Sequence, residues 1–413
     1  MPPSPEAAAS HRRRRHRRDR RLRLWGRLAI SAALGLLGLL LATLVGAGLP
    51  AFTQTLVRVD FPIRADLVDP ADPASGDYRQ IVRLGVAALL PDRVGRPILS
   101  GNAAFFVRDA VVAHPSSVGT TLTLAVPAAD RVDQIYKGMA DRSRASEADL
   151  EALDALKAQG RLSRPFDAAL FTRSDSRLPE TAGLAGAMLG SAYILLVCFA
   201  VSLPVGLAAA IHLEEFAPRN RLTALVELTI RTLSDAPPIL FGLLGLTIFV
   251  HMLGLPRATP LVGGLVLGLM TLPSIILAAR AALRAVPVSL REAAYGVGAS
   301  RHQVVLHHVL PLAWPGILSG TIASLARALG EAAPLLLVGM SAFIADPPNG
   351  LLDAAITLPT QIYLWATDPA PGFQARAAAG SLVLLTLLIA MNALAVFLRR
   401  RARLAGAGHG TVA

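Results

Sequence analysis

The chain has 413 residues, of which 53% are hydrophobic and only 16% are charged, against roughly 25% charged residues in soluble domains. This composition leaves too little polar surface to cover a water-soluble globule, and so excludes an ordinary soluble protein. The net charge of +12 is concentrated at the two ends of the chain. The single cysteine, Cys198, excludes a disulfide framework within the chain.

Long stretches free of Asp, Glu, Lys and Arg recur along the chain, each at least about the 20 residues that a helix needs to cross a bilayer. Backbone in lipid must satisfy its own hydrogen bonds, so each stretch predicts a helix. The fold class is therefore an all-α polytopic membrane protein with six transmembrane helices. We expect these helices at residues 28–52, 181–212, 223–253, 260–283, 313–340 and 377–398.

The basic segment 1–27 contains HRRRRHRRDRRLRL and lies directly before the first predicted helix. Such a run can indicate nucleic-acid binding, but next to a span it sets the orientation, because positive residues stay in the cytoplasm. We therefore expect no nucleic-acid partner and a cytoplasmic N-terminus. Six spans return the chain to the same side, which makes the basic tail 399–413 cytoplasmic as well.

An insert at residues 53–180 follows the first helix and lies outside the cytoplasm on this topology. The segments 55–63 and 120–126 alternate apolar and polar residues as strands do. The segments 77–90 and 146–160 have the apolar spacing of helices. The insert is therefore expected to be an α+β extracytoplasmic domain between helices 1 and 2.

Motifs of known catalytic chemistry are missing from the sequence. The only two lysines, Lys137 and Lys157, do not stand in the glycine-rich loop that binds ATP phosphates. H-E-x-x-H, C-x-x-C and G-x-S-x-G are absent too. We expect no catalytic residue, no cofactor and no metal, and any ATP that drives this protein must be hydrolysed by another subunit.

The internal loop at residues 284–312 carries the strongest positive signal. Within REAAYGVGASRHQVVLHHVLP, a short helix that opens with Glu292 precedes a turn at Gly296 and Gly298. A second amphipathic stretch follows, which Pro311 is expected to stop. The pattern alone leaves two interpretations open, an ordinary loop on the membrane surface or a protruding knob that contacts a partner.

Two ionisable residues, Arg327 and Glu331, lie within the fifth predicted helix. They are four residues apart and are expected to share one helix face. Charges at membrane depth are costly and usually face the bundle interior or an aqueous path. Two compatible roles follow, a structural ion pair, or an arginine that binds a passing anion while Glu331 balances its charge in the empty state.

The internal loop resembles the EAA loop of the permease subunits of ABC importers, in which a coupling helix docks on the ATPase subunit. The chain departs from the family pattern at His308, where the family usually has Ile or Val. The resemblance implies that the coupling residues are Glu292, Ala293, Ala294, Gly298, Leu310 and Pro311.

The segments ARALGEAAPLL at 326–336 and LPTQIYLWATDP at 358–369 are similar to those of PstA-type phosphate permeases. This resemblance implies a type I ABC importer permease core at 181–398, with Arg327 and Glu331 on the translocation path. It also implies two PstB-like ATPase subunits, a second, PstC-like permease subunit, an extracytoplasmic PstS-like phosphate-binding protein, and membrane lipid in the bacterial inner membrane.

Two alternatives to phosphate import stay open from the sequence. One is a permease for another oxyanion, such as sulfate or molybdate. The other is a membrane-anchored sensor or enzyme that acts through the insert, where His114 is the only histidine. One departure bears on substrate contacts: Pro238 stands where the PstA pattern has Ser, so a hydroxyl contact at that position is lost.

Overall fold

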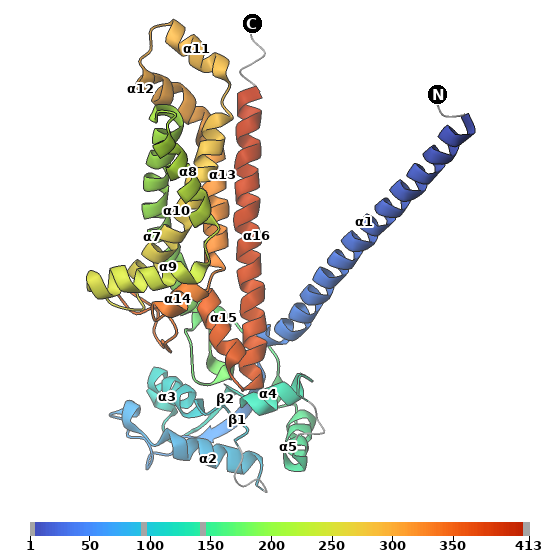
Figure 1. Ribbon diagram of the computed structural model, residues 1–413. Helices are drawn as coiled ribbons and strands as arrows, with labels where there is room; N and C mark the ends of the chain where they lie inside the picture. The colour runs from blue at the N-terminus through green and yellow to red at the C-terminus, as the bar shows by residue number, and fades with distance from the viewer. Residues whose placement is uncertain (1–4, 92–96, 141–145, 408–413) are drawn as a thin grey trace.

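The computed structural model describes residues 5–91, 97–140 and 146–407, and in these residues a long helical bundle carries a small α+β insert at one end (Figure 1). The outermost parts of the predicted basic segment and tail, residues 1–4 and 408–413, lie outside the described residues.

The first helix, α1 (Pro5–Gly48), runs through both the predicted basic segment and the predicted first span. The C-terminal end of α1 lies against the bundle, and the rest of α1 extends away from the bundle as a separate rod (Figure 1). Its apolar window is 0% buried within the chain. Only its last turns touch the rest of the protein, where Gly48 packs on the backbone of Ala378.

The insert contains a three-stranded antiparallel sheet in the order β2–β1–β3. The central strand β1 (Leu56–Pro62) pairs with β2 (Thr121–Pro127) along its whole length and with β3 (Leu162–Ser163) at its start. Helices cover the sheet, and both predicted strands and both predicted helices are present. The insert helices are α2 (Tyr78–Leu89), α3 (Ala103–Ala113), α4 (Asp130–Tyr136), α5 (Glu147–Ala158) and α6 (Ala169–Thr172).

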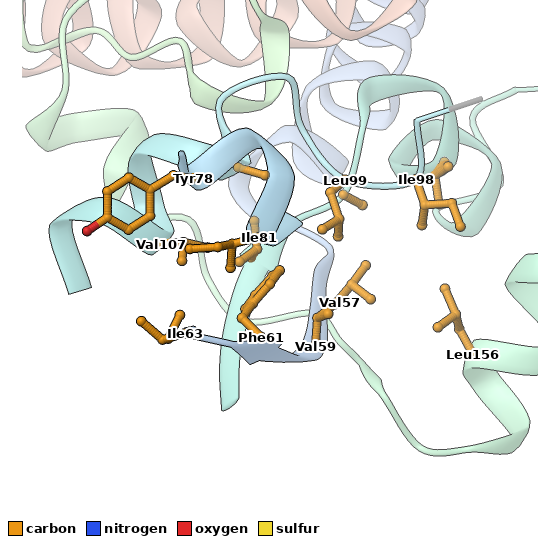
Figure 2. Close-up of a cluster of buried hydrophobic side chains, with 14 of the residues drawn as sticks. Val57, Val59, Phe61, Ile63, Tyr78, Ile81, Ile98, Leu99, Val107 and Leu156 are labelled. Atoms are coloured by element: carbon orange, nitrogen blue, oxygen red, sulfur yellow. The ribbon is translucent and has the colours of Figure 1, made fainter. Parts of the chain in front are cut away.

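The insert has its own hydrophobic core between the sheet and its helices (Figure 2). Val57, Val59 and Phe61 alternate along β1 and are fully buried. They pack in one cluster with Ile81 of α2 and Val107 of α3. Each such side chain contributes about 1.5–3 kcal/mol on burial, so the period-2 pattern that predicted this strand also stabilises the domain.

The permease bundle is built around α10 (Pro260–Arg284), which packs between α7 (Ala185–Ile211) and α13 (Leu310–Leu329). The last helix, α16 (Pro371–Ala407), packs on α13 and extends beyond the predicted 377–398 at both ends. Gly264 of α10 lies so close to Val197 of α7 that a Cβ atom there would stand 2.4 Å from the valine. Small residues therefore set the distance between these helices, as is usual in lipid.

The third predicted helix, 223–253, is not one straight helix. It consists of α8 (Arg221–Ser234) and α9 (Pro238–Gly245), and the two are bent by 100°. A π-helical segment, Leu246–Met252, continues α9. Pro237 and Pro238 cause the break, because neither has an N–H to donate into the preceding turn.

The fifth predicted helix, 313–340, begins earlier and ends earlier than expected. Its apolar span runs from Arg301 to Leu329, through a π-helical segment at Val304–Val309. A separate short helix, α14 (Ala333–Leu337), follows, because Gly330 weakens the helix and Pro334 starts a new one. Pro311 does not stop the helix as predicted, since it stands in the first turn of α13, where no N–H partner is needed.

Among the described residues, five helices are long and apolar enough to span a membrane, and the bent α8–α9 pair makes a sixth candidate. The remaining elements are short. α15 (Leu358–Thr367) packs on α16 next to the insert, and α11 (Val288–Gly296) and α12 (Arg301–Gln303) form the opposite end of the bundle (Figure 1). The 3₁₀ turns are Leu49–Phe52, Pro73–Ser75, Pro115–Ser117 and Pro179–Thr181, and His212–Phe216 is π-helical.

Candidate functional site

The α11 helix protrudes at the end of the bundle farthest from the insert (Figure 1). Glu292 and Ala293 are exposed on it, whereas Ala294 is buried against the bundle. Glu292 has no side-chain partner in the part of the chain that the structure describes. One side of α11 is thus fixed to the permease and the other is available to a partner.

Apolar side chains are exposed around this protrusion. Val288 and Val297 are 65% and 84% exposed, and Leu290 and Tyr295 are also exposed. They lie beyond the end of α10, on α11 and the turn that follows it, which also carry Glu292. We call this protrusion, residues 288–300, the knob. An apolar surface of this kind around a charged residue is typical of a protein–protein contact.

Gly298 shapes the end of α11. Its φ of +86° lies in the left-handed region, which favours glycine. The N–H of Ala299 donates to the carbonyl of Ala294 at 3.1 Å, and the N–H of Gly298 donates to that of Tyr295 at 2.9 Å. These two bonds form a Schellman motif, so Gly298 ends the knob helix by turning the chain sharply.

The other predicted coupling residues follow in the next helical stretch. Ser300 and Gln303 form a capping box that starts α12. Leu310 is half-buried and Pro311 is exposed, both at the start of α13. His308 is exposed too, so its polar ring is not buried within this chain.

Two adjacent acids hold the knob to the bundle, a relationship that the sequence did not reveal. Arg291 of α11 binds both carboxylate oxygens of Glu215, at 2.5 and 2.6 Å. The Arg301 guanidinium donates to the backbone carbonyl of the same Glu215. Both acids lie in the π-helical end of α7, so this short loop joins α7 to α11 and α12.

The neighbouring Glu214 accepts from two arginines of α10, from Arg280 at 3.1 Å and from Arg284 at 2.6 Å. Arg280 also reaches Glu227 of α8 at 2.6 Å. These pairings were not predicted from the sequence. The adjacent acids in HLEEFAPRNR were the signal that could have predicted them.

A second site lies in the bundle, where Arg327 and Glu331 line one pocket of about 240 Å³. The pocket is formed by the bend between α8 and α9, the middle of α10 and the end of α13. It is lined by Ser234, Ala236, Pro238, Phe241, Met270, Thr271, Ser274, Ala323, Ser324, Arg327 and Glu331.

The expectation that Arg327 and Glu331 share one helix face is wrong, because α13 ends at Leu329. Gly330 caps the helix, and Glu331 stands in the turn that leads to α14. Within the described residues the two side chains form no ion pair with each other and no hydrogen bond to another group. They face the same pocket as separate charges.

A buried polar cluster joins the insert to the start of α16. Arg376 of α16 donates to Asp167 of the insert at 2.9 Å, and both side chains are buried. Lys137 of α4 binds Asp133 at 2.6 Å beside them. Burial raises the pKa of Glu180 in this cluster, although a hydrogen bond from Ser100 partly opposes the shift. In the described part of the chain, no three His, Cys, Asp or Glu side chains are placed to hold a metal ion.

Comparison with known proteins places the chain in a family. The family model described as "binding-protein-dependent transport system inner membrane component" matches residues 202–404. The phosphate transport system permease protein PstA of Xylella fastidiosa is 31% identical over 238 residues, which are 57% of this chain and 82% of that protein. The chain belongs to the PstA-type family of ABC permeases.

The chain is also similar to a second permease and to a solved transporter, and its N-terminal part matches another family model. The probable ABC transporter permease protein YqgI of Bacillus subtilis is 30% identical over 54% of this chain and 79% of its own length. A solved methionine ABC transporter, MetNI, resembles 53% of this chain and 94% of its own chain, with 18% identity and a TM-score of 0.40. Residues 9–146 match a separate family model, a domain of unknown function named DUF3333.

As a PstA-type permease, the chain is a multi-pass transport subunit and not an enzyme. Its helical fold with a small sheet near the N-terminus was predicted correctly, and so was its family. ABC permeases of this kind act with ATPase and substrate-binding subunits. The knob at α11 and the Arg327 pocket are where roles in coupling and transport are expected, and both roles stay predictions at this point.

Proposed function

We propose that the chain is the membrane permease subunit of an ATP-driven importer that carries inorganic phosphate across the bacterial inner membrane. The observation that carries this proposal is Arg327, which faces a pocket of mixed polar and apolar lining in the bundle without a protein partner among the described residues. Arginine stays charged at any working pH, and its planar fork of N–H donors matches an oxyanion. The names of the PstA relatives support phosphate as that oxyanion.

The arrangement in Figure 1 supports a topology with the insert outside the cell. The knob at α11, the basic N-terminal part of α1 and the basic end of α16 lie at one end, and the insert lies at the other. Arginine-rich segments next to spans stay in the cytoplasm. On this topology both termini are cytoplasmic, and the knob reaches the side of the membrane where ATP is available.

Coupling on this proposal runs through the knob. The exposed Glu292, Ala293, Val288 and Val297 are positioned to enter a groove on one of two PstB-like ATPase subunits. The Arg291–Glu215 contact would transmit the motion of that subunit to α7. A second, PstC-like permease completes the pore, and a PstS-like binding protein delivers phosphate on the insert side.

The proposal is tested by labelled-phosphate uptake in a bacterial cell that lacks its own PstA subunit and expresses this chain. We expect ATP-dependent uptake to be restored. Sulfate and molybdate uptake are measured in the same cells, and restoration of either in place of phosphate would favour the other-oxyanion alternative. An inserted chain that restores no anion uptake contradicts a permease function in that host.

The topology has its own test. Ser300 lies in the loop after α11, and Cys198 is the only native thiol. In a Cys198→Ser background, Ser300→Cys should react with a membrane-permeant thiol reagent but not with an impermeant one added to intact cells. Reaction with the impermeant reagent would place the knob outside and exclude contact with an ATPase.

A further inference from the structure

The Arg327 pocket contains more than one kind of hydrogen-bonding group. Ser234 at the end of α8 and Ser274 of α10 face each other there, with their hydroxyl oxygens 3.1 Å apart. Two hydroxyl groups that share one hydrogen bond keep one hydrogen free to donate elsewhere. The other pocket hydroxyls, those of Ser324 and Thr271, donate to carbonyls of their own helices.

These hydroxyls bear on the departure noted at Pro238. The PstA pattern has a serine at that position, and Pro238 lines this same pocket. Pro238 can supply no hydroxyl to the pocket. Ser234 of α8 and Ser274 of α10 supply hydroxyls there instead.

The pocket also contains a group that only accepts. As a carboxylate, Glu331 has no hydrogen to donate. An oxyanion that binds Arg327 places an oxygen near this carboxylate, which costs free energy unless that oxygen carries a hydrogen. With a volume of about 240 Å³, the pocket exceeds the roughly 10–15 Å³ that one water needs, so a small tetrahedral anion fits together with water.

We propose that Glu331 makes this pocket selective for tetrahedral oxyanions that carry a proton, by accepting that proton in a hydrogen bond while Arg327 and the Ser234–Ser274 pair donate to the other oxygens. Phosphate and arsenate keep a proton at neutral pH, whereas sulfate has none. Glu331 is then a specificity-determining residue and Arg327 supplies general attraction. This inference rests on the proposed function and assigns the choice of anion within it.

The test measures equilibrium binding of phosphate, arsenate and sulfate to the purified full-length chain in lipid nanodiscs, so that no binding protein contributes to the selection. For the wild-type chain we expect phosphate and arsenate to bind at least about tenfold more tightly than sulfate, the cost of leaving a polar group unpaired. In Glu331→Gln the amide donates to either kind of anion, so this ratio should fall to about one.

Two further variants separate the roles. Glu331→Asp keeps the carboxylate acceptor and should keep the preference for phosphate and arsenate over sulfate. If it does, a change at position 331 does not by itself disrupt the fold, and the loss in Glu331→Gln is due to the lost acceptor. Ser234→Ala removes a donor that all three anions use, so it should weaken the binding of each severalfold and leave the preference over sulfate unchanged. Glu151→Gln, an equivalent change at an exposed position on α5, is the matched control and should change nothing.

A wild-type chain that binds the three anions equally, or binds none of them, overturns the inference. So does a Glu331→Gln variant that still rejects sulfate. If cells that lack their own PstA subunit take up phosphate when they express the wild-type chain while either result holds, the proposed function stands and only the assignment of Glu331 is overturned. Failure of that rescue by an inserted chain counts against the proposed function itself.

Discussion

Arg291 of α11 contacts both carboxylate oxygens of Glu215, at 2.5 and 2.6 Å, although 76 residues separate the two in the chain. The same guanidinium donates to the carbonyl of Leu283 near the end of α10 at 2.8 Å. One side chain therefore joins the knob to two helices of the bundle. A displacement of α11 must move α7 and α10 or break these bonds.

The first prediction concerns this contact. Glu215→Gln and Arg291→Gln should each reduce phosphate uptake while ATP hydrolysis by the assembled transporter persists, because the knob would move without carrying α7. A charge-assisted hydrogen bond contributes about 1.5–3 kcal/mol, so each change should be measurable in thermal unfolding as well.

A double-mutant cycle separates this effect from general damage. If the two residues act as one unit, the Glu215→Gln, Arg291→Gln double variant should be little worse than either single variant. Fully additive losses would show that the two side chains act independently. Arg64→Gln in the insert, whose exposed pair with Asp66 lies far from the knob, is the control.

The second prediction concerns the exposed surface of the knob. Glu292→Lys reverses the charge of a side chain that has no partner within the described residues. We expect uptake to be abolished while membrane insertion and the melting temperature of the chain stay unchanged. Uptake and the amount of ATPase subunit that copurifies with the chain are the measurements, and normal uptake would remove the coupling role.

The contrast between Glu292 and Arg291 explains what the sequence could predict at the knob. Glu292 and Gly298 belong to a local motif, and local turn chemistry is encoded by neighbouring residues. The partner of Arg291 lies in a different loop, and no spacing rule connects them. A single sequence shows that both charges exist but not which acid faces which arginine.

A limit of the same kind explains the outcome at the second site, the pocket that Arg327 and Glu331 line. Charge-free runs predicted a bundle of membrane-spanning helices, because lipid demands about 20 apolar residues. They could not predict that Gly330 and Pro334 end α13 at Leu329, two residues before Glu331 and eleven residues before the expected helix end at residue 340. Glu331 therefore left the helix face on which sequence spacing placed it, yet it stays in the same pocket as Arg327.

The third prediction concerns Arg327. Arg327→Gln should lower phosphate uptake by at least about tenfold and leave expression nearly unchanged, because Arg327 has no ion pair in the described structure whose loss would destabilise the fold. Arg327→Lys keeps the charge but not the planar fork, and should restore only part of the uptake.

A structural role would give a different result. Expression and uptake would then fall together in Arg327→Gln, and the lysine variant would restore both. Quantifying the chain in the membrane fraction beside each uptake measurement distinguishes the two cases.

The fourth prediction concerns the junction between insert and bundle. Burial raises the pKa of Glu180 above its ordinary value of 4.5, against a hydrogen bond from Ser100. Burial likewise raises the pKa of Asp130 above 3.8, partly opposed by hydrogen bonds from Gln134 and Gly372. An acid whose pKa is higher in the folded state stabilises the fold fully below its ordinary pKa, and this stabilisation is lost as the pH rises through the raised value.

The melting temperature of the full chain in detergent should therefore fall as the pH rises from about 4 toward 8. Lys137 acts in the opposite sense, because burial lowers its pKa below the ordinary value of 10.5 and its contribution to stability grows as the pH rises toward that value. Glu180→Gln keeps the uncharged form at every pH, so it should be more stable than the wild type at neutral pH and show a shallower decline.

Glu151→Gln is again the control, because Glu151 is exposed on α5 and should leave the pH dependence unchanged. Hydrogen exchange in β1 and β2, corrected for the intrinsic effect of pH, locates the change in the insert. If Glu180→Gln and the wild type decline with equal slopes, the pH dependence arises outside this cluster. Since Arg376 of α16 donates to Asp167 and lines the same pocket as Glu180, a shallower slope would mean that protonation of Glu180 stabilises the junction between the insert and the last helix of the permease.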